Sequence, residues 1–264
     1  SRVMGSASEI PPERRRPRAG DGQAVTADQP IATDERRARR SVVRASPRTR
    51  QPPLLARLAA RARPDIAFWG ATEEAVYALS LDDGPDPALT PHVLEVLARY
   101  DARASFFLIG SRARRHPALV RRILDEGHEV ANHMWRDERA ARLSDQDFES
   151  SLLKTHEVLT GLGACWRLKR PGSGFVGPAK VRIAGRHGYR CVLGSVYGFD
   201  PQVPSSLWTS WCVRRFLHPG AVVILHEGQA SRQYVLPVLE ALLDDGRRRG
   251  LRTRTASQLL SPSG

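Results

Sequence analysis

The sequence is poor in cysteine and in aromatic residues, and it has no long hydrophobic run. Cys165, Cys191 and Cys212 are odd in number and show no C-x-x-C spacing, so we assign neither a disulfide framework nor a thiolate metal site. We find no apolar stretch long enough to span a membrane and no apolar core of a secretory signal. With 41% hydrophobic residues among 264, the chain can still bury one large core, as a single α/β domain commonly does.

The first 64 residues differ in composition from the rest of the chain. They contain 15 arginines and six acidic residues, and no aromatic residue precedes Phe68. Such a segment cannot bury enough apolar surface to offset the entropy lost on ordering, so we expect 1–64 to be a disordered or linker arm rich in Arg and Pro. Within it, only 54–63 has the pattern of a short basic helix. The acidic residues argue against a transit peptide, and because the chain begins with Ser1, a removed signal and the localisation both stay open.

The positive charge of the chain is concentrated in this arm. Of the net charge of +13, residues 1–64 carry +9 and residues 65–264 carry +4. A basic arm can bind nucleic acid or an anionic surface, but a solvated charged tail is the simpler interpretation. We therefore expect no nucleic-acid partner, and we keep a binder that works through the arm as an alternative.

From residue 65 onward, apolar segments of strand and helix type alternate. Strands are expected at 75–81, 104–110, 128–132, 165–169, 189–196, 221–227 and 252–256, and helices at 90–100, 116–127, 143–163, 178–188, 206–217 and 235–250. This alternation predicts parallel strands with helical crossovers. We expect an α/β fold, an irregular (β/α) barrel over 65–264, in preference to an open two-faced sheet.

Polar residues follow the carboxyl ends of most of the expected strands. They are Asp82, Asp83, His133, Asp137, Arg170, Asp200 and His226. In a barrel of parallel strands these ends lie on one face, where reacting groups collect. His133 and Asp137 are four residues apart, which on a helical turn would place both on one face, and an Asp/His/Asp set suits Zn²⁺. Each of these residues taken alone is more typical of a structural role.

Several stretches of this sequence occur in the order of a known set of motifs. They are "ALSLDDGPDPALTPHVLEVL", "ASFFLIG", "EGHEVANHMWRDE", "RPGSGF", "GAVVILHEG" and "LRTRTASQLL". Together they resemble the polysaccharide deacetylase (NodB-homology) family, carbohydrate esterase family four, over roughly residues 65–262. Motifs in the right order are far more specific than any single match. The stretch "NHMWRDE" is similar to a cyanobacterial and algal branch of that family.

The resemblance implies a metal-dependent hydrolase that removes acetyl groups from N-acetylated carbohydrate, either chitin-like or peptidoglycan-like. It implies Asp82 as the general base and Arg170 as the residue that keeps this base ionised. His226 would be the general acid, and Asp200, in a looser motif, would pair with His226. These roles agree with the chemistry, because a base must take a proton from water and an acid must give one to the leaving amine.

The same resemblance implies a divalent metal ion, most simply Zn²⁺, held by Asp83, His133 and Asp137. The chain departs from the family at Asp137, where a histidine is usual, and a carboxylate-rich set is less selective for zinc. It also departs at Gly172 and Ser173, where the family has an aromatic residue, so the substrate groove is expected to differ in shape.

Two alternatives of other kinds stay open beside this hypothesis. One is a carbohydrate-binding pseudoenzyme of the same fold without a catalytic metal, and the other is the arm-dependent binder. Trp166, Trp208 and Trp211 are candidates for stacking on sugar rings, although packing is an equally good interpretation of each. The sequence leaves open which glycan is bound, which metal, and the oligomeric state.

Overall fold

The strand that ends at the first of the paired aspartates, β2 (Val76–Asp82), is fully buried and lies within a parallel sheet. The computed structural model of the chain describes residues 51–261. The other strands of the sheet are β1 (Ile66–Ala67), β3 (Ala104–Leu108), β4 (Glu129–Asn132), β5 (Leu168–Lys169), β6 (Arg190–Val192), β7 (Val196–Tyr197), β8 (Val222–His226) and β9 (Arg252–Arg254). Because β2 has no solvent-exposed face, its sequence is apolar almost throughout.

The strands follow the order β1-β6-β5-β4-β3-β2-β8-β7. The remaining strand, β9, pairs with the first residues of β2. Every ladder is parallel, which agrees with the alternation of strand and helix in the sequence. Between β6 and β7 the chain crosses from one end of this order to the other, with Leu193 N–H bonded to Ala67 O and Ser195 N–H bonded to Val222 O. The sheet therefore curls into an irregular barrel.

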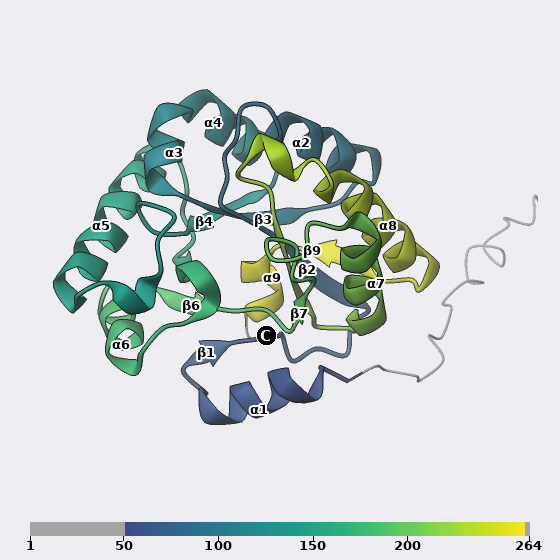
Figure 1. Cartoon of the computed structure of the whole chain (residues 1–264), viewed down its shortest axis with the longest axis horizontal. Helices are drawn as coiled ribbons and strands as arrows, with labels where there is room; N and C mark the ends of the chain where they lie inside the picture. Colours follow the sequence, from purple (N-terminus) through teal and green to yellow (C-terminus); the bar gives the residue numbers. More distant parts are fainter. Residues whose placement is uncertain (1–50, 262–264) are drawn as a thin grey trace, which may run out of the picture. The chain divides into compact units, whose positions relative to one another are not determined.

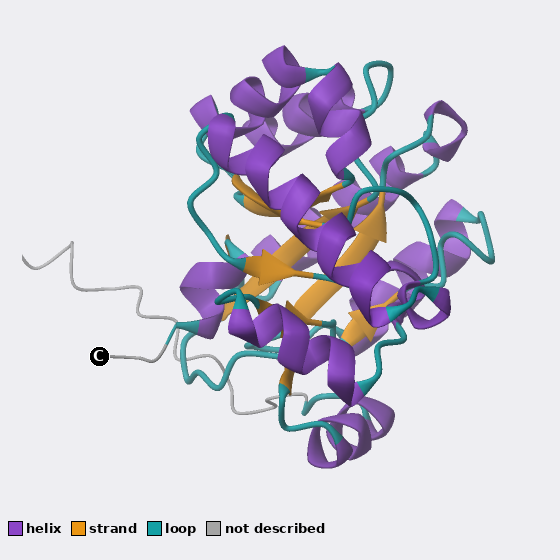
Figure 2. Ribbon diagram, turned by 90° about the vertical axis from the view of Figure 1, so that its left-hand side faces the viewer, coloured by secondary structure: helices purple, strands orange, loops and turns teal. Residues whose placement is uncertain are grey.

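Helices surround the strands (Figures 1 and 2). They are α1 (Leu54–Ala62), α2 (Thr90–Arg99), α3 (Gly110–Arg115), α4 (Pro117–Asp125), α5 (Asp145–Gly161), α6 (Pro178–Arg186), α7 (Ser206–Phe216), α8 (Val235–Arg248) and α9 (Ala256–Leu260), with short 3-10 turns η1 (Ala140–Arg142), η2 (Gly172–Gly174) and η3 (Ala230–Arg232). Ser144 caps α5 by accepting a hydrogen bond from Asp147 N–H. Within residues 51–261, no helix combines the length and the apolar character needed to cross a membrane.

Helix α9 was not expected from the sequence, and it packs against the interior of the barrel. Leu259 and Leu260 join a buried cluster with residues of β2, β4, β6 and β8. Thr255 begins the helix with a capping box, and Ser105 Oγ accepts a hydrogen bond from Ala256 N–H at 2.7 Å. The helix bonds to Ser105 and Glu129, which form the first pair of the β3–β4 ladder and so mark the amino ends of these strands. The carboxyl ends of the strands, on the opposite side, are not covered by α9.

Part of the segment that the sequence assigned to the arm is folded. Helix α1 forms within the segment assigned to the arm, where a short helix was the one exception. Ala59 and Ala60 pack against a buried cluster, and Arg63 donates a hydrogen bond to Val176 O at 2.8 Å. The rest of the expected arm, 1–50, lies outside the described residues.

Two other expected elements differ in detail. The strand expected at 189–196 is divided into β6 and β7, since the chain turns away near Gly194, where a Cβ would lie 2.5 Å from Ile224. The strand expected at 104–110 ends at Leu108, because α3 begins at Gly110 in close contact with Trp135 and Thr155. Both differences arise from tertiary contacts that local periodicity does not contain.

Candidate active site

A cavity of about 840 Å³ lies at the carboxyl ends of the strands. Its lining includes six of the seven residues that the sequence placed at strand ends: Asp82, Asp83, His133, Asp137, Arg170 and His226. The seventh, Asp200, is completely buried and bonds to His226. The parallel ladders bring these residues together, because the register places Asp82 of β2 directly opposite His226 of β8.

Asp82 is buried and is held on one side by a guanidinium group. Arg170 Nη1 donates to Asp82 Oδ1 at 2.5 Å and to Ser80 Oγ at 2.8 Å, and the guanidinium lies over the ring of Phe107. The other carboxylate oxygen, Oδ2, lies 3.9 Å from His226 Nε2. One oxygen of Asp82 is therefore fixed and charge-compensated, while the other faces the cavity and the histidine.

His226 is oriented by Asp200. The Asp200 carboxylate accepts a hydrogen bond from the backbone N–H of His226 at 2.9 Å and lies 3.0 Å from its ring Nδ1. Burial opposes a charge on the ring, but the hydrogen bond to Asp200 and the charges of Asp200, Asp82 and Asp83 outweigh it and raise the pKa of His226 above its ordinary value. The Nδ1 contact leaves Nε2 to act toward the cavity.

Asp83 has three polar partners at the floor of the site. Its Oδ1 lies 3.1 Å from His133 Nε2, its Oδ2 accepts a hydrogen bond from Arg232 Nη1 at 2.6 Å, and its carbonyl accepts one from Arg112. Burial would raise the pKa of Asp83, but the hydrogen bond and charge of His133, the charge of His226 and the bond to Arg232 hold it well below its usual range. Asp83 is therefore a carboxylate at any physiological pH.

Asp83 and His133 fit two positions in the ligand set of a divalent cation. An ionised carboxylate oxygen and a ring nitrogen that face each other are donors of the type that Zn²⁺ takes. Asp137 lines the same cavity but is exposed, and residues 133–137 form a loop, so the helical spacing considered in the sequence does not apply. Within residues 51–261, no three His, Cys, Asp or Glu side chains are grouped closely enough to hold a metal ion.

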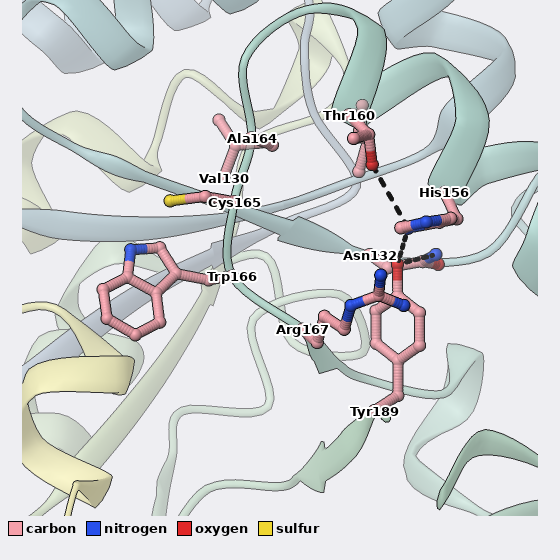
Figure 3. Close-up of a pocket in the computed structure, with 10 residues that line it drawn as sticks. Val130, Asn132, His156, Thr160, Ala164, Cys165, Trp166, Arg167 and Tyr189 are labelled. Atoms are coloured by element: carbon pink, nitrogen blue, oxygen red, sulfur yellow. Dashed lines mark hydrogen bonds between the residues drawn. The ribbon is translucent and has the colours of Figure 1, made fainter. Parts of the chain in front are cut away.

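The path of this loop is set by Asn132. Its side chain accepts a hydrogen bond from Met134 N–H at 2.8 Å, and Met134 has a positive φ of 68°. A small pocket of about 70 Å³ beside β4 shows how Asn132 is held: the hydroxyl of Tyr189 lies 3.4 Å from its amide nitrogen and 2.9 Å from His156 Nδ1 (Figure 3). This network fixes the direction in which the chain leaves His133.

Positive φ angles at residues other than glycine gather around the cavity. Five such residues occur within 51–261, and four of them are at or next to the site: Asp83, Met134, Ser173 and Phe199. Backbone strain of this kind costs on the order of 1–3 kcal/mol per residue and persists where the surroundings enforce it. Its concentration here indicates a functional site.

Glu227 lies directly beneath the turn that carries Asp83 and was not singled out in the sequence. It is completely buried, it accepts a hydrogen bond from Thr90 Oγ1 at 2.5 Å, and a Cβ on Gly84 would lie only 2.0 Å from its Oε1. Burial raises the pKa of Glu227 to about 8. The side chain is therefore a neutral acid at pH 7 and supports the turn without adding charge to it.

Glu227→Gln is expected to change how stability depends on pH. A carboxyl group with a pKa near 4.5 when unfolded and about 8 when folded stabilises fully below pH 4.5, and this stabilisation is lost as the pH rises to 8. Each pKa unit corresponds to about 1.4 kcal/mol. Urea unfolding of metal-free protein at pH 5, 7 and 8.5 should show this decline in the wild type and a flatter profile in the variant. The exposed residue Glu73 provides the control, and Glu73→Gln should follow the wild-type profile. A Glu227→Gln profile that also runs parallel to the wild type would contradict the prediction.

Arg112 and Arg232 are the other site residues that sequence reasoning missed. Arg232 belongs to η3, six residues beyond His226, and Arg112 belongs to α3, and both reach the Asp83 turn across the end of the sheet. Arg232 could have been found from the sequence, because it lies in the loop that follows β8, and the loops after the carboxyl ends of the strands contribute residues to such sites.

A buried Asp–Arg pair and an Asp-supported histidine lie together at the carboxyl face of a parallel barrel, which places groups able to take and give protons in one cavity. The sequence profile of the Polysaccharide deacetylase family matches residues 70–192. Over 190 residues the chain is 34% identical to a peptidoglycan-N-acetylglucosamine deacetylase of Bacillus cereus, covering 71% of this chain and 89% of that protein. The chain belongs to the polysaccharide deacetylase family, which confirms the resemblance seen in its motifs.

Other similar proteins agree with this assignment. A chitooligosaccharide deacetylase of Sinorhizobium fredii is 32% identical, over 60% of this chain and 74% of its own length. The crystal structure of the Bc1960 peptidoglycan N-acetylglucosamine deacetylase, in complex with a benzamide compound, has a TM-score of 0.73 and 28% identity, covering 78% of this chain and 97% of that one. The expected irregular (β/α) barrel is confirmed, while the cyanobacterial and algal branch stays a prediction.

Proposed function

We propose that this carbohydrate deacetylase is a metal-dependent hydrolase that removes acetyl groups from an N-acetylated glycan. Its relatives carry the names of peptidoglycan and chitooligosaccharide deacetylases, which supports a substrate built from N-acetylated amino sugars. The observation that carries the proposal is the placement of Asp82, with one oxygen on Arg170 and the other facing His226, beside the facing donors Asp83 and His133.

Asp83 and His133, joined by Asp137 from the same cavity, are the residues we assign to hold a divalent cation, most simply Zn²⁺. When bound, such a cation supplies Lewis-acid chemistry, lowering the pKa of water and polarising the acetyl carbonyl. Because Asp83 is held ionised inside a buried site, it can offer a full negative charge to the ion. Arg232 donates a hydrogen bond to Asp83 Oδ2 and compensates part of this charge.

Asp82 takes the proton of the attacking water, since its Oδ2 faces the cavity while Arg170 holds its Oδ1 in place. The water oxygen forms a bond to the acetyl carbon, and the amide C–N bond breaks. His226 gives the proton on Nε2 to the leaving nitrogen, while Asp200 stabilises the imidazolium. A backbone N–H of the 171–174 turn, which lines the cavity, is suited to donate to the oxyanion. The products are acetate and an amino sugar.

Acetate release from chitooligosaccharides and from peptidoglycan fragments tests the proposed activity. We expect release that is abolished by a chelator and restored by added Zn²⁺. The same substrates without N-acetyl groups provide the blank. Release that a chelator leaves unchanged would contradict the metal requirement, and no release from either substrate by zinc-loaded protein would favour the pseudoenzyme.

Zinc titration by calorimetry tests the ligand assignment independently of substrate. We expect one site per chain, with binding weakened at least 10-fold by Asp83→Ala, because that substitution removes the buried ionised donor. Asp137→Ala should also weaken binding if the exposed loop closes on the ion. Asp101→Ala, an exposed carboxylate away from the cavity, serves as the matched control. Binding that is indifferent to Asp137→Ala would remove Asp137 from the set.

The pseudoenzyme is retained as the second candidate because such proteins occur among similar structures. The crystal structure of a BA3943 mutant, a CE4 family pseudoenzyme with restored enzymatic activity, has a TM-score of 0.68 and 25% identity, covering 74% of this chain and 71% of that chain. In the present chain, the exposed position of Asp137 is the feature that favours this reading. Absence of zinc binding in the titration would establish it over the enzyme.

A further inference from the structure

Large apolar side chains are exposed along the outer side of α7 and the loop before it. The exposed fractions are 84% for Leu207, 54% for Trp211, 52% for Phe199, 45% for Trp208 and 41% for Val203. We call these five residues the α7 surface. Apolar area left in water is unfavourable, so exposed aromatic residues gathered within 13 positions indicate a binding surface.

The α7 surface begins at the rim of the active-site cavity. Phe199 lines that cavity, and its ring lies 4.9 Å from the ring of Tyr197, which in turn lies 5.8 Å from the ring of His226. Phe199 O accepts a hydrogen bond from Val203 N–H at 2.7 Å, which turns the chain toward α7. The surface is therefore continuous with the cavity wall.

Helix α7 holds its two tryptophans on the side that faces away from the barrel. Thr209 is buried on the opposite side and packs so closely on the wall that a Cβ on Gly198 would lie 2.5 Å from its Cγ2. Trp208 and Trp211 are three residues apart, and their rings lie 5.5 Å apart with an interplanar angle of 32°. The two rings therefore pack against each other outside the core, and each keeps about half of its surface exposed.

We propose that the α7 surface binds the part of a polymeric glycan that extends beyond the active-site cavity. This inference rests on the proposed function, because it takes the glycan as the occupant of the cavity. The faces of pyranose rings present C–H groups while their hydroxyl groups point outward from the ring edge. A flat, half-exposed indole matches that division, with an apolar face and a polar N–H at its edge. Thr209 of α7 packs on Gly198, next to Phe199, so a glycan that leaves the cavity past Phe199 can extend onto the helix that carries Trp208 and Trp211.

Sedimentation with insoluble chitin and with peptidoglycan sacculi tests the proposal on the full chain. We expect Trp208→Ala/Trp211→Ala to bind at least 10-fold more weakly than the wild type, and Trp208→Phe/Trp211→Phe to retain most of the binding. Trp166→Ala is the matched control, because Trp166 is similarly exposed, at 49%, but lies at the separate small pocket of Figure 3. Equal sedimentation of the wild type and the double alanine variant, or none by the wild type on either polymer, would overturn the proposal.

A parallel experiment with phosphatidylglycerol vesicles addresses the competing occupant. Helices that bear Trp and Leu beside arginines also bind membrane surfaces. Vesicle binding that the double alanine variant loses, with glycan sedimentation unchanged, would assign the surface to lipid and overturn the proposal. Since sedimentation requires no turnover, a protein that binds glycan through the two tryptophans but releases no acetate would support the α7 surface and contradict the proposed activity. The two hypotheses can therefore fail separately.

Discussion

Asp82→Asn is expected to lower the rate of acetate release by a factor on the order of 10²–10⁴, the usual contribution of a positioned general base. An amide has nearly the shape of the carboxylate and can still accept the hydrogen bond from Arg170, but it cannot take a proton from water. The measurement is kcat/KM on an N-acetylated chitooligosaccharide with saturating zinc. Asp101→Asn, an exposed carboxylate distant from the cavity, should leave the rate unchanged.

The interpretation of this variant depends on two further measurements. Removal of the charge leaves the buried guanidinium of Arg170 without its counter-charge, and breaking a buried pair commonly destabilises by about 3–5 kcal/mol. Thermal unfolding shows whether the variant is folded at the assay temperature. Zinc calorimetry should give wild-type affinity, because Asp83 and His133 are unchanged. A folded, zinc-binding variant that retains most of its activity would show that Asp82 is not the base.

The position of the paired aspartates could be predicted from the sequence because local and global signals agree there. Gly84 and Pro85 end an apolar run, so the strand had to stop at Asp82 and Asp83. Once the strands are parallel, every residue at a carboxyl end lies on the same face. This rule also brought His133, Arg170 and His226 to one cavity, although it could not give the distances between them.

The surroundings of Asp83 and the position of Asp137 could not be predicted in the same way. Asp137 lies in a loop whose path depends on the Asn132 bond to Met134 N–H and on the positive φ of Met134. Arg232 reaches Asp83 from a turn 149 residues further along the chain. Such contacts are set by how loops cross the end of the barrel, which periodicity does not encode. The same holds for α7, whose tryptophans fit a packed helix in the sequence and are exposed in the structure.

Asp200→Asn is expected to move the alkaline limit of activity to lower pH and to reduce kcat/KM at neutral pH by about 10²-fold. Buried Asp200 accepts a hydrogen bond from the backbone of His226 and contacts its Nδ1, and together with Asp82 and Asp83 it raises the pKa of His226 against the effect of burial. Because the proposed acid must be protonated, activity falls as the pH rises through this pKa. Without the charge of Asp200 the pKa falls, so the imidazolium is lost at a lower pH.

The titration of His226 can be followed without turnover, by NMR of the ring protons in the metal-free protein. The wild-type ring should titrate above the ordinary histidine pKa and the Asp200→Asn ring below the wild type. The stability of the protein should change accordingly. A His226 pKa that is higher in the folded than in the unfolded state stabilises the fold at low pH, and this stabilisation is lost as the pH rises through the folded-state pKa. The contribution should be smaller in Asp200→Asn. Glu149→Gln, which removes the carboxylate partner of His187 on the surface, is the control for a distant pair and should leave the pH–rate profile unchanged. An alkaline limit that stays in place in Asp200→Asn would mean that His226 is not the group that must hold the proton, since its principal charge partner would then have no influence on the reaction.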